Sequence, residues 1–302
     1  MDKGKQFELY APKKINNAKL LTAAASGTSE WHEARASSIG GSQIGAVLGL
    51  NQYESAFSLW AKKTGQVSDF VEDNWYMKFG RAFEEPLLRL WQNENPSFDV
   101  YTTGIYQDGT DPFLTASPDA LAHDPETGEY IVLEVKTARN YWTEVPPSYR
   151  AQVVQYMDIL GLSRAIILGI AGWDWQECII ELDQFEADSQ RAAARRLWKH
   201  VMDNTQPDFD GADVTYETVR KMNPDIDLEA EVYIDGVWEL ANAQTELDEA
   251  KAKFNRQKSE VLSIMGNARH AYFEHDGEKI IVATRQGRGD GIPFLKIKKG
   301  KK

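Results

Sequence analysis

From residue 31 to residue 206 the apolar positions follow helical spacing in some segments and strand spacing in others, which predicts alternating helices and strands. The clearest helix covers 75–93, where Pro86 is expected to introduce a local kink. Its apolar stripe consists of Phe79, Phe83, Leu87, Leu90 and Trp91. Further helices are predicted over 42–49 with Ser42 as N-cap, over 55–64, over 148–161 with Ser148 as cap, and over 188–202.

Strand patterns occupy four segments of the same region, at 113–123, 129–137, 164–171 and 175–182. The first two flank the turn sequence Asp124-Pro125-Glu126-Thr127-Gly128. Helices combined with such strands predict an α/β fold, with a mixed central sheet flanked by helices and some antiparallel pairing.

The ends of the chain depart from this pattern. We interpret residues 1–30 as an N-terminal arm, 31–206 as the core, and 207–230, which are acidic and contain two prolines, as a linker. Residues 231–302 are predicted to form a C-terminal helical arm with a small hairpin around Asp276 and a basic tail.

The predicted helix over 238–265 has apolar residues seven positions apart, at Leu240, Leu247, Phe254 and Val261. Ala243, Ala250, Gln257 and Ile264 follow three positions later, as in a heptad seam. Four heptads are the minimum for a coiled coil, and Gln257 interrupts the seam. A helix that packs on the core of its own chain is therefore the favoured interpretation.

Composition narrows the class of protein. The 302 residues are 42% hydrophobic and 26% charged, as in ordinary globular proteins. No apolar run approaches the ~20 residues that span a bilayer, and no segment resembles a signal peptide, so the expected location is cytoplasmic. Cys178 is the only cysteine, which excludes an internal disulfide and suits a reducing compartment.

The net charge of −12 does not by itself favour a nucleic-acid partner. Net charge governs long-range steering, however, whereas a local basic groove can still bind phosphates. A metal-dependent site also needs acidic residues, because a bound cation reverses their local field.

The most informative motifs are Ser117-Pro118-Asp119 and Glu134-Val135-Lys136. A four-residue turn at 125–128 would place Asp119 opposite Glu134, with Cβ atoms about 4.5–5.5 Å apart. Two carboxylates so close are unfavourable unless a cation neutralises them. Strand alternation places Glu134 and Lys136 on one face, while Ile131, Leu133 and Val135 face the core. A register slip of one residue would remove this pairing.

This set of groups suits phosphodiester hydrolysis. Oxygen ligands bind Mg²⁺, the metal lowers the pKa of a bound water, and a neighbouring lysine can orient that water. For an isolated Asp…Glu-x-Lys pattern an ordinary surface hairpin would be the better interpretation, because the pattern is short and common.

Two helices add candidates. Glu84 lies beside the apolar stripe of 75–93, from which its carboxylate can reach a metal held by the hairpin, and Glu85 is the alternative. On the helix 148–161, Tyr149, Gln152 and Tyr156 share a face with apolar residues, which indicates the edge of a site. Ordinary core hydrogen bonding is nearly as good an explanation for Tyr156.

A possible anion site lies earlier in the chain. Arg35 can form two charge-assisted hydrogen bonds to a phosphate. Ser42 lies at the predicted start of a helix, and Gly40 and Gly41 allow close backbone approach. The alternative is that Arg35 pairs with an acid such as Glu33 and that Ser42 only caps the helix.

These motifs occur in a characteristic order: Trp31-His32-Glu33-Ala34-Arg35, Ser42, Gly80-x-x-Phe83-Glu84, Ser117-Pro118-Asp119, Glu134-x-Lys136 and Tyr149-x-Ala151-Gln152. On them the chain resembles the lambda-type exonuclease, or YqaJ-like viral recombinase, family of the PD-(D/E)xK nuclease superfamily. The resemblance covers roughly residues 30–200, and its specificity lies in the joint order and spacing of motifs that are individually weak.

The resemblance implies an enzyme that uses Mg²⁺, with Mn²⁺ as a substitute, to digest one strand of duplex DNA from its 5′ ends. The resulting 3′ tails would serve a single-strand annealing recombinase, in a phage or prophage system of a bacterial host. A homo-oligomer, typically a ring trimer, is implied, without membrane association.

By motif, the resemblance makes Glu84, Asp119, Glu134 and the carbonyl of Val135 metal ligands. Lys136 would position the attacking water, and Gln152 would support the site. Arg35, Ser42, Ser117 and Tyr149 would contact DNA or its 5′-phosphate. Val154 departs from the family, because many relatives have a second glutamine there, and Gln155 points about 100° further round the helix.

Two alternatives stay open. A restriction-type endonuclease or a repair nuclease of the same superfamily would have the same active site, but only an exonuclease spares covalently closed circles. A DNA-end-binding protein without activity is the other alternative, and it would not need opposed carboxylates beside a lysine.

Overall fold

The computed structural model describes residues 12–24, 27–69, 74–138, 141–171, 174–289 and 291–298. The chain divides into two compact units, Met1–Ile226 and Asp227–Lys302, and each is described by itself.

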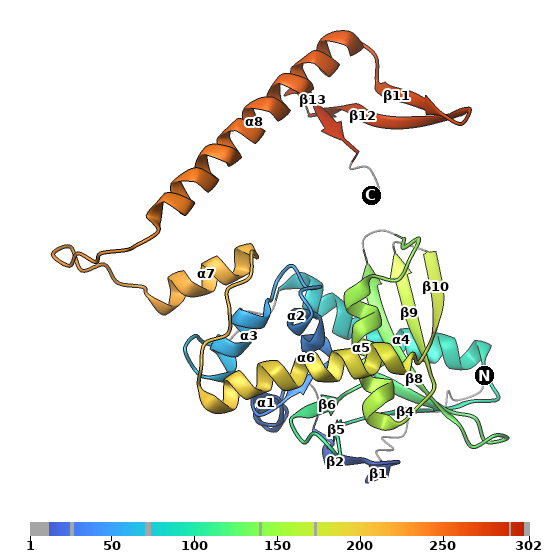
Figure 1. Ribbon diagram of the computed structural model, residues 1–302. Helices are drawn as coiled ribbons and strands as arrows, with labels where there is room; N and C mark the ends of the chain where they lie inside the picture. The colour runs from blue at the N-terminus through green and yellow to red at the C-terminus, as the bar shows by residue number, and fades with distance from the viewer. Residues whose placement is uncertain are drawn as a thin grey trace. The chain divides into compact units, whose positions relative to one another are not determined.

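A five-stranded mixed sheet forms the centre of the first unit (Figure 1). Its strand order is β10-β9-β8-β7-β4. The strands are β4 (Asp99–Thr102), β7 (Ala120–His123), β8 (Tyr130–Ala138), β9 (Arg164–Ala171) and β10 (Asp174–Glu181). β8 and β9 are parallel and the other pairs are antiparallel, so the predicted mixed sheet is confirmed.

Helices cover both faces of this sheet. α4 (Trp75–Glu94) packs Leu87, Leu88 and Trp91 on the face that carries Leu133 and Val135. α5 (Pro147–Leu160) covers the other face and contacts α6 (Gln184–Asp203). Both faces of β8 are therefore buried, and Glu134 is positioned on the α5 side within the protein rather than on a surface hairpin.

A second five-stranded sheet has the order β1-β2-β5-β6-β3. Its strands are β1 (Lys14–Ile15), β2 (Ala18–Thr22), β3 (Ile39–Gly40), β5 (Ile105–Gln107) and β6 (Leu114–Ala116). The remaining helices of this unit are α1 (Ser29–Ala36), α2 (Gly41–Val47), α3 (Ala56–Lys63) and α7 (Asp213–Met222).

The predicted register of the β7–β8 hairpin is confirmed. Ala120 pairs with Leu133 and His123 with Tyr130, and the backbone of Asp124 donates to Glu129 across the turn at 2.9 Å. The single strand expected over 113–123 is instead two strands, β6 and β7, in different sheets. Pro118 lies at this break, where a residue without an N–H cannot continue a ladder.

Several predicted element ends need correction. Gly40, not Ser42, is the N-cap of α2, and Gln43 fills the capping role because its side chain accepts from the Gly40 N–H at 3.1 Å. α5 begins at Pro147, a favoured first helical residue, so Ser148 is not its cap. In α4 only Leu87 and Trp91 of the predicted stripe are buried, whereas Phe79 and Phe83 are each 38% exposed and Leu90 is 55% exposed.

The segments expected to be peripheral contain ordered elements. Residues 12–24 of the predicted arm include β2, which pairs with β5. Within the predicted linker, α7 packs on α3, and the buried hydroxyls of Thr215 and Ser55 lie 2.6 Å apart. The compact first unit thus extends to Ile226.

The second unit contains α8 (Val237–Met265), β11 (His270–His275), β12 (Glu278–Arg288) and β13 (Gly291–Ile297). The strands form an antiparallel sheet in the order β11-β12-β13, so a third strand joins the predicted hairpin. Met265, Ala283 and Leu295 form a small core together with Val261 and Leu262.

Only the C-terminal end of α8 packs on this core. Leu240, Leu247 and Phe254, the first three positions of the heptad seam, are 73%, 61% and 49% exposed. No helix among the described residues is both long and apolar enough to cross a membrane.

Candidate active site

The carboxylate of Glu134 is the centre of the candidate site. The residue is 2% exposed, and its Oε1 accepts hydrogen bonds from Lys136 Nζ at 2.5 Å and from Gln152 Nε2 at 2.6 Å. Its Oε2 is also buried, but no donor among the described residues reaches it. A buried anionic oxygen without a partner is unfavourable, so Oε2 has the capacity to bind a positively charged ligand.

Asp119 lies opposite Glu134, as the hairpin register requires. Its Oδ2 accepts a hydrogen bond from the backbone N–H of Val135 at 2.7 Å. Burial and repulsion from the carboxylates of Glu134 and Glu84 raise the pKa of Asp119 well above its usual range.

Glu84 is half-buried on α4, which packs on β8. Burial raises its pKa, repulsion from Glu134 raises it further, and Lys136 partly opposes both effects. Glu85 points elsewhere and pairs with Arg89 one turn later, so Glu84 is the carboxylate of this helix that faces the site.

Lys136 remains protonated in this setting. Burial lowers its pKa, but the carboxylates of Glu134 and Asp119 raise it by more, so the net pKa is raised. The Lys136 ammonium also lies 5.2 Å from the ring centroid of Tyr149. Three carboxylates thus face Lys136, and Arg81 also acts on Glu84, which still leaves an excess of negative charge.

The donor set fits a divalent cation by its chemistry. It offers carboxylate oxygens from Glu84, Asp119 and Glu134, one of them buried and unpartnered, and the backbone carbonyl of Val135, which are the oxygen ligands that Mg²⁺ prefers. In the described parts of the chain, no three His, Cys, Asp or Glu side chains are close enough together to form a ready-made metal site. Mutual repulsion, evident in the raised pKa values, opposes convergence of the three carboxylates, and a cation would remove that repulsion.

Gln152 and Tyr156 connect this centre to α2. The Gln152 amide also donates to the hydroxyl of Tyr156 at 2.9 Å. A Cβ at Gly41 would lie 2.3 Å from Cε1 of Tyr156, so only glycine permits this close approach. Burial raises the pKa of Tyr156 well above its usual value, and Glu134 adds to this effect.

Arg35 lies beyond Tyr156, at the N-terminus of α2. Its Nη2 donates to the hydroxyl of Ser42 at 3.0 Å, and its guanidinium lies 4.6 Å from the ring centroid of Trp31. Burial lowers its pKa. In the described structure no carboxylate forms an ion pair with Arg35, so the expected alternative pairing with Glu33 is not observed.

Lys63 is a residue that the sequence analysis missed. It lies at the end of α3, and its Nζ donates to the carbonyl oxygen of Arg35 at 2.6 Å. Burial and the nearby Arg35 charge lower its pKa to about 8. In the sequence, Lys62-Lys63 looks like an ordinary basic end of a helix, so no local signal distinguished it.

The other predicted residues have varied positions. Ser117 is half-buried between β6 and β7, and Tyr149 lies beside Lys136. Gln155 does not replace a second site glutamine, because its amide donates to the backbone carbonyls of Ile39 and Thr115 and so ties β3 to β6. Val154 is fully buried in the core.

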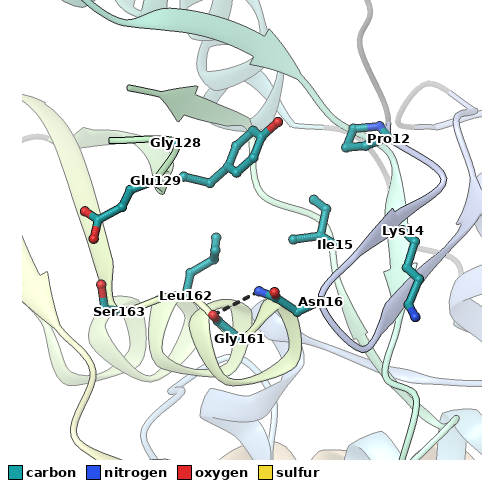
Figure 2. Close-up of a pocket in the computed structure, with 10 residues that line it drawn as sticks. Pro12, Lys14, Ile15, Asn16, Gly128, Glu129, Gly161, Leu162 and Ser163 are labelled. Carbon is teal, nitrogen blue, oxygen red and sulfur yellow. Dashed lines mark hydrogen bonds between the residues drawn. The ribbon is translucent and has the colours of Figure 1, made fainter. Parts of the chain in front are cut away.

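A separate pocket of about 500 Å³ lies where β8 begins and α5 ends (Figure 2). Asn16 donates hydrogen bonds to the carbonyls of Leu160 and Gly161 at its edge. Ile15, Tyr130 and Leu162 also line it, and none of the candidate catalytic residues does. It is not part of the acidic centre.

Comparison with known proteins agrees with this geometry. Residues 30–163 match the YqaJ-like viral recombinase domain. The chain is 29% identical over 204 residues to the uncharacterized protein YqaJ of Bacillus subtilis (strain 168), and the match covers 64% of this chain and 62% of that protein. The chain thus spans less than two thirds of this relative's length.

An alkaline exonuclease from Laribacter hongkongensis has a similar solved structure. The TM-score is 0.51 at 18% identity, and the match covers 65% of this chain and 99% of the exonuclease. This likeness agrees with the α/β fold class predicted from the sequence, a mixed central sheet flanked by helices.

Proposed function

We propose that this chain, which belongs to the YqaJ-like viral recombinase family through residues 30–163, is a Mg²⁺-dependent exonuclease. It would digest one strand of duplex DNA from its 5′ ends and leave 3′ single-stranded tails. The observation that carries the proposal is the buried, unpartnered Oε2 of Glu134 beside Asp119 and Lys136. An inactive DNA-binding protein has no need of such an arrangement, because it is unfavourable without a cation.

The residues present can perform the hydrolysis. Glu84, Asp119, Glu134 and the Val135 carbonyl would hold the metal ion, which supplies an acidified water and neutralises phosphate charge. Lys136, whose raised pKa keeps it protonated, orients the attacking water and stabilises the negative charge that builds on the scissile phosphate. Gln152 holds Glu134 in place through Oε1, so that Oε2 stays available.

The reaction balances without a further co-reactant. The water oxygen forms a bond to phosphorus and gives up a proton to solvent. The bond from phosphorus to the 3′ oxygen breaks, and the departing 3′ oxygen takes a proton from solvent. The remaining strand keeps a new 5′-phosphate.

Arg35, Ser42 and Lys63 are suited to bind that terminal phosphate. The Arg35 guanidinium has no carboxylate partner in the described structure, and Ser42 is the second residue of α2, whose N-terminal N–H groups favour an anion. Because Gln152 and Tyr156 connect this pocket to Glu134, one strand can contact both sites. This juxtaposition favours the exonuclease over an endonuclease of the same superfamily.

Assembly and partners are proposed on the resemblance. A homo-oligomer, in the form of a ring trimer, would encircle the duplex, and a single-strand annealing recombinase would receive the 3′ tail. The mass of the purified protein in sedimentation tests the first point. Co-purification with a candidate annealing protein tests the second.

One experiment tests the activity. Linear and covalently closed duplex DNA are incubated with Mg²⁺, with Mn²⁺ or with EDTA, and linear substrates carry either a 5′-phosphate or a 5′-hydroxyl. We expect metal-dependent digestion of linear DNA only, faster from phosphorylated ends, with less preference in Arg35→Ala. Cleavage of closed circles would favour an endonuclease, and binding without any cleavage would favour the inactive end-binding protein.

A further inference from the structure

The sheet of the second unit differs in charge from the rest of the chain. Residues 266–302 contain nine lysine and arginine residues and only four aspartate and glutamate residues, whereas the whole chain has a net charge of −12. A basic segment within an acidic protein is a local electrostatic feature that attracts a polyanion.

The strand register shows which residues share the sheet face that is turned away from α8. Ala283 and Leu295 face the small core under α8. Thr284 and Lys296 therefore lie on the opposite face, because neighbours along a strand alternate. His270 pairs with Thr284, and its Nδ1 lies 3.0 Å from the threonine hydroxyl. Each of the three strands therefore contributes side chains to this outer face.

Aromatic side chains occupy the same outer face. Along β11, Tyr272 follows His270 by two residues and shares its face, whereas Phe273 alternates with Ala271 toward the core side. Phe294 pairs with Gln286, two residues beyond Thr284 on β12. Tyr272 is 51% exposed and Phe294 is 46% exposed, so their rings are available to a ligand. We define the outer face by His270, Tyr272, Phe294, Lys296 and Lys298.

Charge on the outer face is mainly positive. Lys296 and Lys298 project from β13 and the residue that follows it, and both are exposed. Glu274, which pairs with Lys279, is the acidic residue among the described members of this face. The phosphates of a nucleic acid complement the charge of these lysines.

We propose that the outer face of the β11-β12-β13 sheet binds single-stranded DNA. Exposed aromatic rings can stack on bases only where the bases are unpaired, and the lysines neutralise phosphates along the same strand. Duplex DNA would use the lysines but not the aromatic rings, since its bases are already stacked. The face would then hold the strand that an exonuclease leaves behind, which extends the proposed function.

The test uses the full chain in EDTA, so its outcome does not depend on cleavage. Fluorescence anisotropy measures binding of labelled oligothymidylate of 30 nucleotides and of a 30-base-pair duplex. The variants are Tyr272→Ala, Phe294→Ala and the double variant Lys296→Glu/Lys298→Glu. The matched control is Lys251→Glu/Lys253→Glu, which reverses two exposed charges on α8 of the same unit.

We expect each aromatic variant, Tyr272→Ala and Phe294→Ala, to bind oligothymidylate about fivefold or more weakly, with little change for the duplex, as base stacking predicts. The Lys296→Glu/Lys298→Glu variant should bind both DNAs more weakly. Its affinity for oligothymidylate should also depend less on salt, by about 0.7 in the logarithmic slope for each phosphate that a lysine no longer neutralises. The α8 control should bind as the native chain does.

Three results would overturn the proposal. Unchanged affinity of both aromatic variants for oligothymidylate would remove the stacking surface. Equal losses for single strand and duplex would mean general electrostatic attraction alone. A change of oligomeric mass in these variants, measured by sedimentation, would mean that another protein surface covers this face. Thermal melting of each variant checks that the second unit is folded.

Discussion

The side-chain amide of Gln152 donates to Oε1 of Glu134 at 2.6 Å, the same oxygen that accepts the hydrogen bond from Lys136. Both donors therefore stabilise one oxygen and leave Oε2 available for a ligand. Gln152 fixes the orientation of a proposed metal ligand without itself offering charge.

Replacement of Gln152 should therefore weaken metal binding. Partners that orient a metal ligand typically change metal affinity by about 10–100-fold when mutated, and we expect Gln152→Ala to raise the Mg²⁺ concentration for half-maximal cleavage within that range. Gln152→Glu should be worse, because its carboxylate would face that of Glu134 across the same contact. A Mg²⁺ titration of cleavage rates checks this, and an unchanged midpoint in both variants would remove the positioning role.

Asp119→Asn should abolish cleavage but stabilise the metal-free protein. The pKa of Asp119 is higher in the folded protein than in the unfolded chain. The contribution of this carboxyl to folding stability is therefore complete below the unfolded-state pKa, and it is lost as the pH rises through the folded-state pKa. At neutral pH without metal, the neutral amide removes this unfavourable charge. In a domain of this size each kcal/mol of relief raises the melting temperature by about 2–4 °C.

Melting curves in EDTA at pH 7 and near pH 4 test this expectation. The gain from Asp119→Asn should be present at pH 7 and absent at the lower pH, where the native carboxyl is protonated. Glu85→Gln is the matched control, because Glu85 is exposed and pairs with Arg89 away from the site. A lower melting temperature for Asp119→Asn at pH 7 would contradict the repulsion argument.

Lys136→Ala should lose cleavage while retaining DNA binding. The Lys136 ammonium is proposed to stabilise charge that develops only during reaction, and removal of one such group costs about 10²–10³ in rate. Single-turnover cleavage rates and binding in EDTA separate the two effects. If Lys136→Ala turns over nearly as fast as the native chain, the lysine has only a structural role.

The sequence predicted the acidic centre because local signals determined it. The turn at 125–128 sets the hairpin register, and that register alone places Asp119 opposite Glu134. Helical spacing then separated Glu84 from Glu85. The burial of Glu134 under α5 and its orphaned Oε2 needed the tertiary structure.

Other features depended on contacts between distant segments, which spacing does not reveal. Lys63 reaches the carbonyl of Arg35 from a different helix, 28 residues later. Gln43 caps α2 in place of Ser42 because its side chain folds back to Gly40. Thr215 anchors α7 to Ser55 across 160 residues, so an acidic, proline-bounded segment that looked like a linker became part of the first unit.

Lys63 provides the last prediction, a pH-dependent preference for 5′-phosphorylated ends. Its pKa is lowered to about 8, so the ammonium is charged below that pH and loses its charge as the pH rises through it. A terminal phosphate has its second pKa near 6 and is already doubly charged across this window. The attraction between them should therefore decline from pH 7 to pH 9.5.

The measurement is the ratio of kcat/KM for 5′-phosphoryl and 5′-hydroxyl duplex ends from pH 6.5 to pH 9.5. This ratio cancels the pH dependence of the shared chemical step and reports groups of the uncomplexed enzyme. We expect the native preference to fall with a midpoint about pH 8. Lys63→Arg should keep it at pH 9.5, because guanidinium stays protonated, and Lys63→Ala should show a weaker preference without that midpoint.

Lys62→Ala is the matched control for this experiment. Lys62 is the adjacent residue, but its ammonium pairs with Glu54 at 2.6 Å instead of approaching Arg35. Its removal should leave the pH profile of the ratio unchanged. A native ratio that stays flat to pH 9.5, or a Lys63→Ala profile that keeps the native midpoint, would exclude Lys63 from phosphate recognition and leave that role to Arg35 and Ser42.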